Sequence, residues 1–150
     1  MLIRINKENS YLSRDWGGSE ADIMDIGLRA METHAFSSEI PNYYFKALGQ
    51  VTDMKKIGSR EGHANVTESE TWKNICFVLD GYLAEPVYAH LRTWNLQRYA
   101  GYAYLFRQRE VFTHIIDQLG GVDNLDVSIF NKIGKNKLNE ALQWYTSHNK

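Results

Sequence analysis

The 150-residue chain has one cysteine, two prolines and no long apolar run, and these shortages exclude several classes of protein. Cys76 alone cannot form an intramolecular disulfide, which favours a reducing compartment. No apolar stretch approaches the roughly 18 residues that span a bilayer. Residues 1–7 contain four apolar side chains, fewer than the roughly seven that the core of a signal peptide needs. We therefore expect a cytoplasmic protein with no membrane contact.

A strong charge of either sign is also missing, since the net charge is −1. Residues 1–85 carry 9 basic and 13 acidic side chains, and residues 86–150 carry 8 and 5, which gives −4 and +3. A nucleic-acid binder usually shows a larger basic excess. The 43% hydrophobic content is that of a folded globular protein, and a chain of this length can bury its own core. We predict one domain over residues 1–150.

Helical periodicity is present along most of the chain and predicts an all-α domain of about five or six helices. Residues 1–5 suit a short strand or an extended arm. Ser19 and Asp22 form an approximate capping box for the first helix, and Gly120 and Gly121 end the longest one. The predicted helical segments are 19–36, 41–49, 67–85, 86–119, 126–133 and 138–145.

Residues 86–119 contain no proline after Pro86 and predict one long central helix. Its apolar face would carry, at helical spacing, Val87, Leu91, Trp94, Arg98, Gly101, Tyr102, Leu105, Arg109, Phe112, Ile116 and Leu119. Residues 99–106 are apolar on almost every side, which indicates a buried helix. Gly101 in this segment indicates either a close approach of another helix or a break, and we favour close approach.

Arg98 and Arg109 interrupt this apolar face eleven residues apart, so on a continuous helix they would face one neighbour. A guanidinium keeps its charge, and a buried one needs an anionic partner. In the favoured interpretation both arginines are structural. Each one either forms an ion pair with an acidic residue of the first half of the chain, or covers apolar surface with its stem while its charged head reaches water. On the ion-pair interpretation, alanine at either position would cost about 3–5 kcal/mol of stability. The functional interpretation is a pocket for an anionic group.

The surrounding segment interleaves arginine with aromatic residues and contains no acid between Pro86 and Arg109. Core packing explains most of these aromatics, a protein interface is the second interpretation, and base stacking on a nucleic acid is the third. The candidate ligand- or partner-binding residues are Trp94, Arg98, Tyr99, Tyr102, Arg107 and Arg109.

Two weaker signals involve histidine. Glu110 and His114 stand four residues apart, with Asp117 three residues further, but no second segment repeats a Glu/His pattern, so a solvated helix face is favoured over a metal site.

His63 follows Arg60 and Glu61 in a glycine-containing loop, where a general base would be possible. Any polar loop would offer similar residues, so we assign no catalytic residue and expect neither metal nor cofactor.

The first functional hypothesis is a non-enzymatic protein-binding module, of the inhibitor, adaptor or immunity type, that uses an aromatic- and arginine-rich helical surface. The alternative is a small enzyme or an anionic-ligand-binding protein with its pocket at Arg98 and Arg109. In that case His63 or His114 would supply proton transfer with a nearby carboxylate. A weak nucleic-acid binder is the second alternative. The expected partner is thus another protein, then a small anion.

Overall fold

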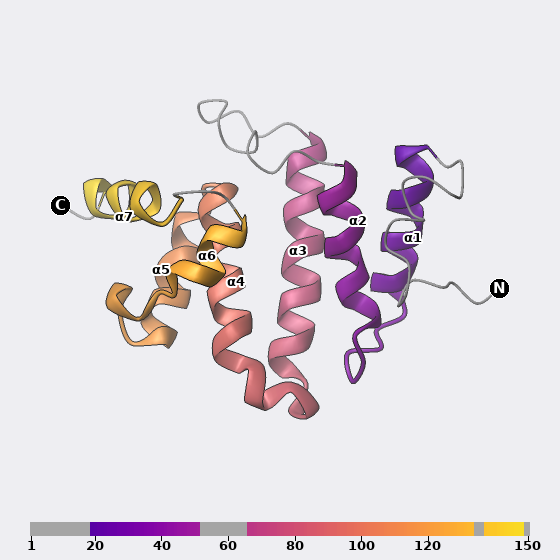
Figure 1. Ribbon diagram of the computed structural model, residues 1–150, viewed down its shortest axis with the longest axis horizontal. Helices are drawn as coiled ribbons and strands as arrows, with labels where there is room; N and C mark the ends of the chain where they lie inside the picture. Colours follow the sequence, from indigo (N-terminus) through magenta and orange to yellow (C-terminus); the bar gives the residue numbers. More distant parts are fainter. Residues whose placement is uncertain (1–18, 52–65, 134–136, 149–150) are drawn as a thin grey trace. The chain divides into compact units, whose positions relative to one another are not determined.

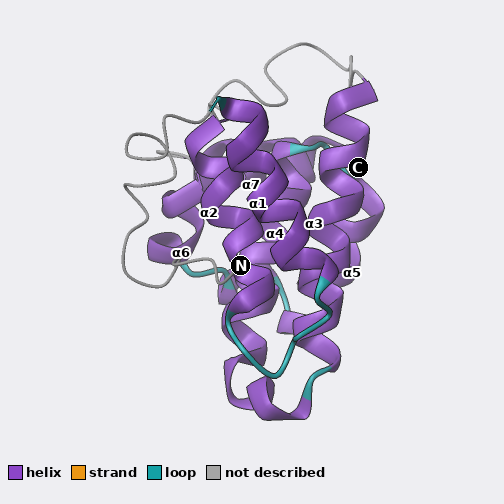
Figure 2. Cartoon of the chain, turned by 90° about the vertical axis from the view of Figure 1, so that its right-hand side faces the viewer, coloured by secondary structure: helices purple, strands orange, loops and turns teal. Residues whose placement is uncertain are grey.

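The computed structural model describes residues 19–51, 66–133 and 137–148. The residues that it describes form seven α-helices and three short 3-10 helices, without a strand (Figure 2). This confirms the predicted all-α class. The predicted segment at Met1–Ile5 lies outside the described residues. The helices are α1 (Glu20–Glu32), η2 (Ile40–Asn42), α2 (Tyr43–Val51), α3 (Val66–Ala84), η4 (Pro86–Leu91), α4 (Arg92–Leu105), α5 (Arg109–Leu119), η5 (Val122–Asn124), α6 (Val127–Ile133) and α7 (Lys137–His148).

The chain divides into two compact units, an amino-terminal unit over Met1–Asp53 and a carboxy-terminal unit over Met54–Lys150. The helices α1, η2 and α2 belong to the first unit, and the remaining helices belong to the second (Figure 1). The single domain over residues 1–150 stays a prediction.

In the amino-terminal unit, α1 begins with the capping box that the sequence predicts. The Asp22 amide donates to the Ser19 hydroxyl at 3.3 Å, and the Ser19 amide donates to the Asp22 carboxylate at 3.1 Å. The helix ends at Glu32, four residues before the predicted end at Phe36. Helices α1 and α2 approach so closely that a Cβ atom built on Gly27 would lie 2.7 Å from the Cβ of Ala47. Glycine is therefore required at this crossing.

In the carboxy-terminal unit, α4 is the central buried helix. Nine of its 14 residues are buried, all of them between Asn95 and Leu105. It contacts α3, α5 and α6, while α7 contacts α6 (Figure 1). The helix continues through the buried Gly101 without a break. The prediction of a buried helix over residues 99–106 is confirmed, except that Phe106 is the C-cap rather than a helical residue.

The prediction of one continuous helix over residues 86–119 is wrong. Residues 86–91 form the 3-10 helix η4 with non-helical backbone at Tyr88, and a second interruption separates α4 from α5. At this interruption the Gln108 amide donates to the Ala103 carbonyl at 2.8 Å and the Arg107 amide donates to the Tyr104 carbonyl at 2.9 Å. These two bonds define a Schellman motif, whose left-handed position is occupied by Arg107 with φ 53°.

The same motif ends α5 in the way that the sequence predicts. There Gly120 occupies the left-handed position with φ 90°, and the Gly121 amide donates to the Ile116 carbonyl at 3.0 Å. Glycine adopts this backbone without steric cost, whereas a side chain costs about 1 kcal/mol. The sequence does not predict the interruption between α4 and α5, because Arg107 occupies the left-handed position that glycine normally marks.

The crossing of α1 and α2 yields a test with a matched control. Gly27→Ala should lower the free energy of unfolding by about 1–3 kcal/mol, because the added methyl group meets Ala47. Gly49→Ala places the same methyl group in open space on α2 and should raise stability by about 0.5–1 kcal/mol through helix propensity. Urea unfolding measures both changes. Equal effects of the two substitutions would contradict the close crossing.

Candidate functional site

The six predicted binding residues differ in exposure. Trp94 and Arg107 are exposed, Tyr99 is buried, and Arg98, Tyr102 and Arg109 are half-buried. They lie on α4, on α5 and in the turn between these helices. They therefore form several separate contacts rather than one binding face.

Trp94 and Arg98 form a cation–π pair on the first turns of α4. The Arg98 guanidinium carbon lies 4.5 Å from the centre of the Trp94 ring. Arg98 Nη1 also donates to Asn95 Oδ1 at 3.2 Å, and Asn95 is only 2% exposed. This bond ties the guanidinium to the buried side of the helix, while Trp94 remains 36% exposed. The orientation of the pair is thus fixed by contacts within α4.

The segment that precedes this pair is unusually accessible. No residue of η4 is buried, and Val87 is 55% exposed. Arg92 is also exposed and donates from Nη2 to Gln118 Oε1 of α5 at 2.8 Å. Within this segment the Trp94 ring and the Arg98 guanidinium lie together, and we call this pair, with the exposed helix η4 that precedes it, the η4–α4 surface.

Arg107 and Arg109 instead contact Trp144 of α7. The guanidinium carbon lies 4.1 Å from the Trp144 ring centre for Arg109 and 6.0 Å for Arg107. Arg107 lies 4.2 Å from the ring of Tyr104 and donates from Nη1 to the Tyr104 carbonyl at 2.6 Å. Trp144 also packs on Phe112 at 5.4 Å. These contacts hold α7 against the turn between α4 and α5 and offset the strained backbone of Arg107.

Arg98 and Arg109 do not share a neighbour in these contacts. Arg98 lies on Trp94, whereas Arg109 lies on Trp144 and donates to its carbonyl at 3.3 Å. The expectation of a common face depended on a continuous helix, which the interruption at Arg107 removes. The described residues supply no ion-pair partner for Arg109, and its Nη1 is buried without a hydrogen bond.

Tyr99 and Tyr102 are held within the packed part of the unit. Burial first, and then hydrogen bonds with Cys76 and Asp80, raise the pKa of Tyr99. Burial also raises the pKa of Tyr102, and the charge of Arg98 partly offsets this. The Cys76 thiol likewise has its pKa raised by burial, which disfavours the nucleophilic thiolate. Tyr99 donates to Asp80 Oδ1 at 2.9 Å and thereby links α4 to α3.

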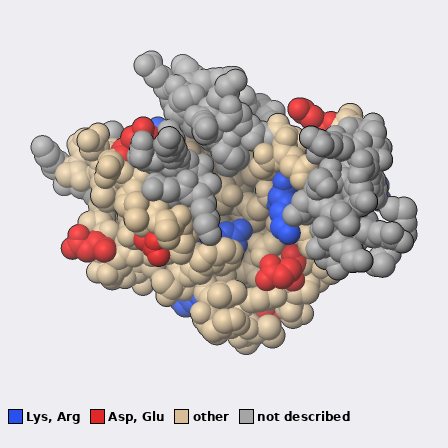
Figure 3. All heavy atoms as spheres, viewed as in Figure 1, with Lys and Arg blue, Asp and Glu red and all other residues tan. Residues whose placement is uncertain are grey.

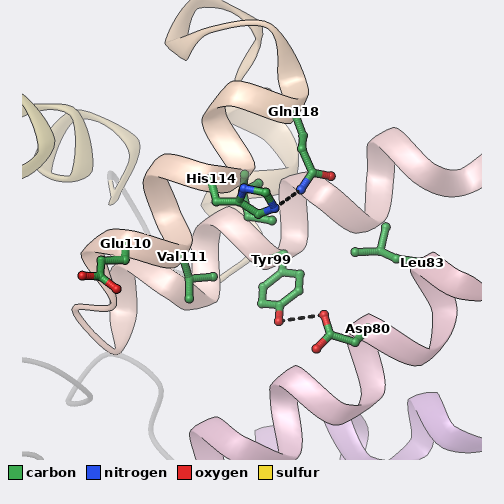
Figure 4. Close-up of a pocket in the computed structure, with 8 residues that line it drawn as sticks. Asp80, Leu83, Tyr99, Glu110, Val111, His114 and Gln118 are labelled. Atoms are coloured by element: carbon green, nitrogen blue, oxygen red, sulfur yellow. Dashed lines mark hydrogen bonds between the residues drawn. The ribbon is translucent and has the colours of Figure 1, made fainter.

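This bond lies in an open pocket of about 320 Å³ between α3, α4 and α5 (Figure 4). Figure 4 shows Tyr99 and Asp80 pointing toward each other, with Glu110 and Gln118 toward opposite ends of the α5 wall. Arg98 and Arg109 do not line this pocket. The lining residues are Asp80, Leu83, Tyr99, Glu110, Val111, His114, Ile115 and Gln118.

The sequence connects only part of this pocket. Glu110 and His114 stand on one helix face and, like Asp117, are exposed, in agreement with the predicted solvated face. Asp80 and Tyr99 come from two other helices, and no local pattern connects them to α5. Asp117, predicted on the same side, does not line the pocket. Arg60, Glu61 and His63 lie outside the described residues.

Neither the distribution of charge nor the placement of metal-binding side chains indicates a further site among the described residues. In the described part of the chain, no group of three or more His, Cys, Asp or Glu side chains is placed to hold a metal ion. On the face shown in Figure 3, the described basic and acidic side chains are scattered and neither sign forms a continuous area. None of the described helices is both long and apolar enough to cross a lipid bilayer.

Comparison with protein-family models, with curated proteins and with solved structures found no match to this chain.

The environment of Arg109 predicts a small effect of removing its charge. Arg109→Met should change the free energy of unfolding by less than about 1 kcal/mol. The substitution loses the cation–π contact, about 0.5–2 kcal/mol, and the hydrogen bond to the Trp144 carbonyl, about 0.5–1.5 kcal/mol. It also removes the unsatisfied buried donor Nη1, which restores about 1–3 kcal/mol. Methionine also keeps a flexible stem on the Trp144 ring. Urea unfolding measures the change.

Phe112→Ala is the control within the same cluster and should cost about 3–5 kcal/mol, since Phe112 is fully buried. A loss of about 3 kcal/mol or more in Arg109→Met would contradict this account and would indicate a buried anionic partner.

Proposed function

We propose that this protein is a non-enzymatic protein-binding module, of the inhibitor, adaptor or immunity type, that binds its partner through the η4–α4 surface. The observation that carries this proposal is the exposed Trp94 ring with Arg98 stacked on it and anchored by the buried Asn95. Tryptophan and arginine dominate the binding energy of protein interfaces. A pair that is already oriented loses less conformational entropy when the partner binds.

The composition of this surface indicates the chemistry of the partner. Residues 86–109 contain no acid, and Arg98 places a cation on the Trp94 ring. The exposed Trp94 ring adds apolar area beside this cation, and Val87 of η4 is also exposed. A complementary partner would present a protein segment with an apolar side chain flanked by carboxylates. The net charge of −1 gives no support to the nucleic-acid alternative, and the face shown in Figure 3 has no continuous basic area among its described residues.

In the test, the full-length wild-type protein and the variants Trp94→Ser and Arg98→Glu each capture proteins from an extract of the native host. Quantitative mass spectrometry then compares the amounts of each captured protein. A partner retained by the wild type should be depleted about tenfold or more by either substitution, because each removes a hot-spot contact. Val127→Ser is the matched control, since Val127 is 54% exposed and belongs to another helix, α6. Circular dichroism confirms that each variant is folded.

The same proteins retained in equal amounts by the wild type and all three variants would contradict the proposal. If Val127→Ser no longer retains the partner while Trp94→Ser still does, the interface lies on α6 instead. A retained partner whose binding to purified protein is unaffected by Arg98→Glu would contradict the proposed carboxylate recognition.

A further inference from the structure

Three exposed side chains, Arg92, His114 and Gln118, form a chain of hydrogen bonds that joins α4 to α5. Arg92 Nη2 donates to Gln118 Oε1 at 2.8 Å, and Gln118 Nε2 lies 2.6 Å from His114 Nε2 (Figure 4). A guanidinium only donates, so Arg92 fixes the oxygen of the Gln118 amide on its own side and the nitrogen on the His114 side. An amide nitrogen also only donates. His114 Nε2 therefore accepts, and the ring proton is on Nδ1.

This arrangement requires a neutral His114 ring. A protonated imidazole carries a proton on each nitrogen, so Nε2 would become a donor facing a second donor, Gln118 Nε2. Half a turn of the Gln118 amide brings its oxygen to His114 and restores that bond, but the same movement presents the amide nitrogen to Arg92. Because Arg92 and His114 contact opposite ends of the amide, its single oxygen cannot accept from both of them in this geometry.

The bond to Arg92 is the weaker of the two once His114 is charged. His114 and Gln118 are four residues apart on α5, so the helix itself holds their side chains together. Arg92 reaches Gln118 from α4 with a long, exposed side chain, whose conformational freedom is lost in the bond. Protonation also makes the bond between His114 and Gln118 charge-assisted, as the bond from Arg92 already is.

The surrounding groups leave histidine as the titrating side chain between about pH 5 and about pH 8. Aspartate and glutamate ordinarily titrate at about pH 4, and tyrosine and arginine at about pH 10 or above. The other charged or titratable side chains that line the pocket with His114, bond to Gln118, or stand on the last turns of α5 and on the adjoining η5 are Asp80, Arg92, Tyr99, Glu110, Asp117 and Asp123. None of this set is a histidine.

We propose that protonation of His114 releases Arg92, because the Gln118 amide turns its oxygen toward His114. The described residues give Arg92 no other hydrogen-bond or ion-pair partner. Protonation therefore opens this side-chain link between α4 and α5 and leaves a free guanidinium at the first residue of α4, two positions before Trp94. This pH-sensitive device is independent of the proposed function, since it uses neither Trp94 nor Arg98.

The test is a pH titration of the full-length, isotope-labelled protein by nuclear magnetic resonance, from about pH 8 to about pH 5. At the upper end, the ring nitrogen shifts of His114 should show a neutral ring with its proton on Nδ1. Nuclear Overhauser effects should join Gln118 to both Arg92 and His114. As His114 becomes protonated, the effect between Arg92 and Gln118 should be lost with the same midpoint, while the effect between His114 and Gln118 should persist.

Three variants separate this device from a general effect of pH. His114→Gln keeps an acceptor that cannot be protonated, and Gln118→Glu supplies two oxygens that accept from both neighbours. Arg92 should stay in contact with position 118 throughout the titration in each of these variants. Gln143→Glu adds the same charge at an exposed position of α7 and should release Arg92 as the wild type does.

Several results would overturn the proposal. One is a contact between Arg92 and Gln118 that persists after His114 is protonated, and another is separation of His114 from Gln118 on protonation. Release of Arg92 with the same midpoint in folded His114→Gln would show that another group controls it. A neutral ring with its proton on Nε2, or a ring that is still neutral at about pH 5, would also overturn the proposal.

Discussion

The reversal of the chain at Arg107 determines how the carboxy-terminal unit is built. Two backbone bonds, from Gln108 to Ala103 and from Arg107 to Tyr104, end α4 in a Schellman motif that needs a left-handed residue. Arginine is a costly choice for that position. The cost is offset because the Arg107 side chain contacts Tyr104 and Trp144. Local backbone geometry and the docking of a distant helix therefore depend on the same residue.

Both candidate sites follow from this reversal. Because α5 returns beside α4, the side chains of Arg92 and Gln118 meet, and the pocket gains its third wall from α5. The same return leaves η4 and the first turn of α4 at the accessible end of the unit, where Trp94 is exposed. Arg98 and Arg109, which a straight helix would place on one face, are separated onto two different tryptophans.

The parts of the fold that could be predicted from the sequence are those with local causes. The capping box at Ser19, the end of α5 at Gly120 and the cap of α6 at Asp126 each involve residues within a few positions of one another. The interruption at Arg107 could not be predicted, because the aromatic rings that stabilise it include Trp144, 37 positions away. The pocket was missed for the same reason: Asp80, Tyr99 and Glu110 come together only through tertiary packing.

The most direct test of this account measures the distance between positions 92 and 118. Spin labels on Arg92→Cys and Gln118→Cys, in a Cys76→Ala background, report that distance by electron–electron dipolar spectroscopy. The substitutions remove one exposed hydrogen bond, which contributes little to stability. Packed neighbouring helices predict a label separation below about 20 Å. A separation of about 39 Å, the rise of a continuous helix over 26 residues, would contradict the reversal and both sites that depend on it.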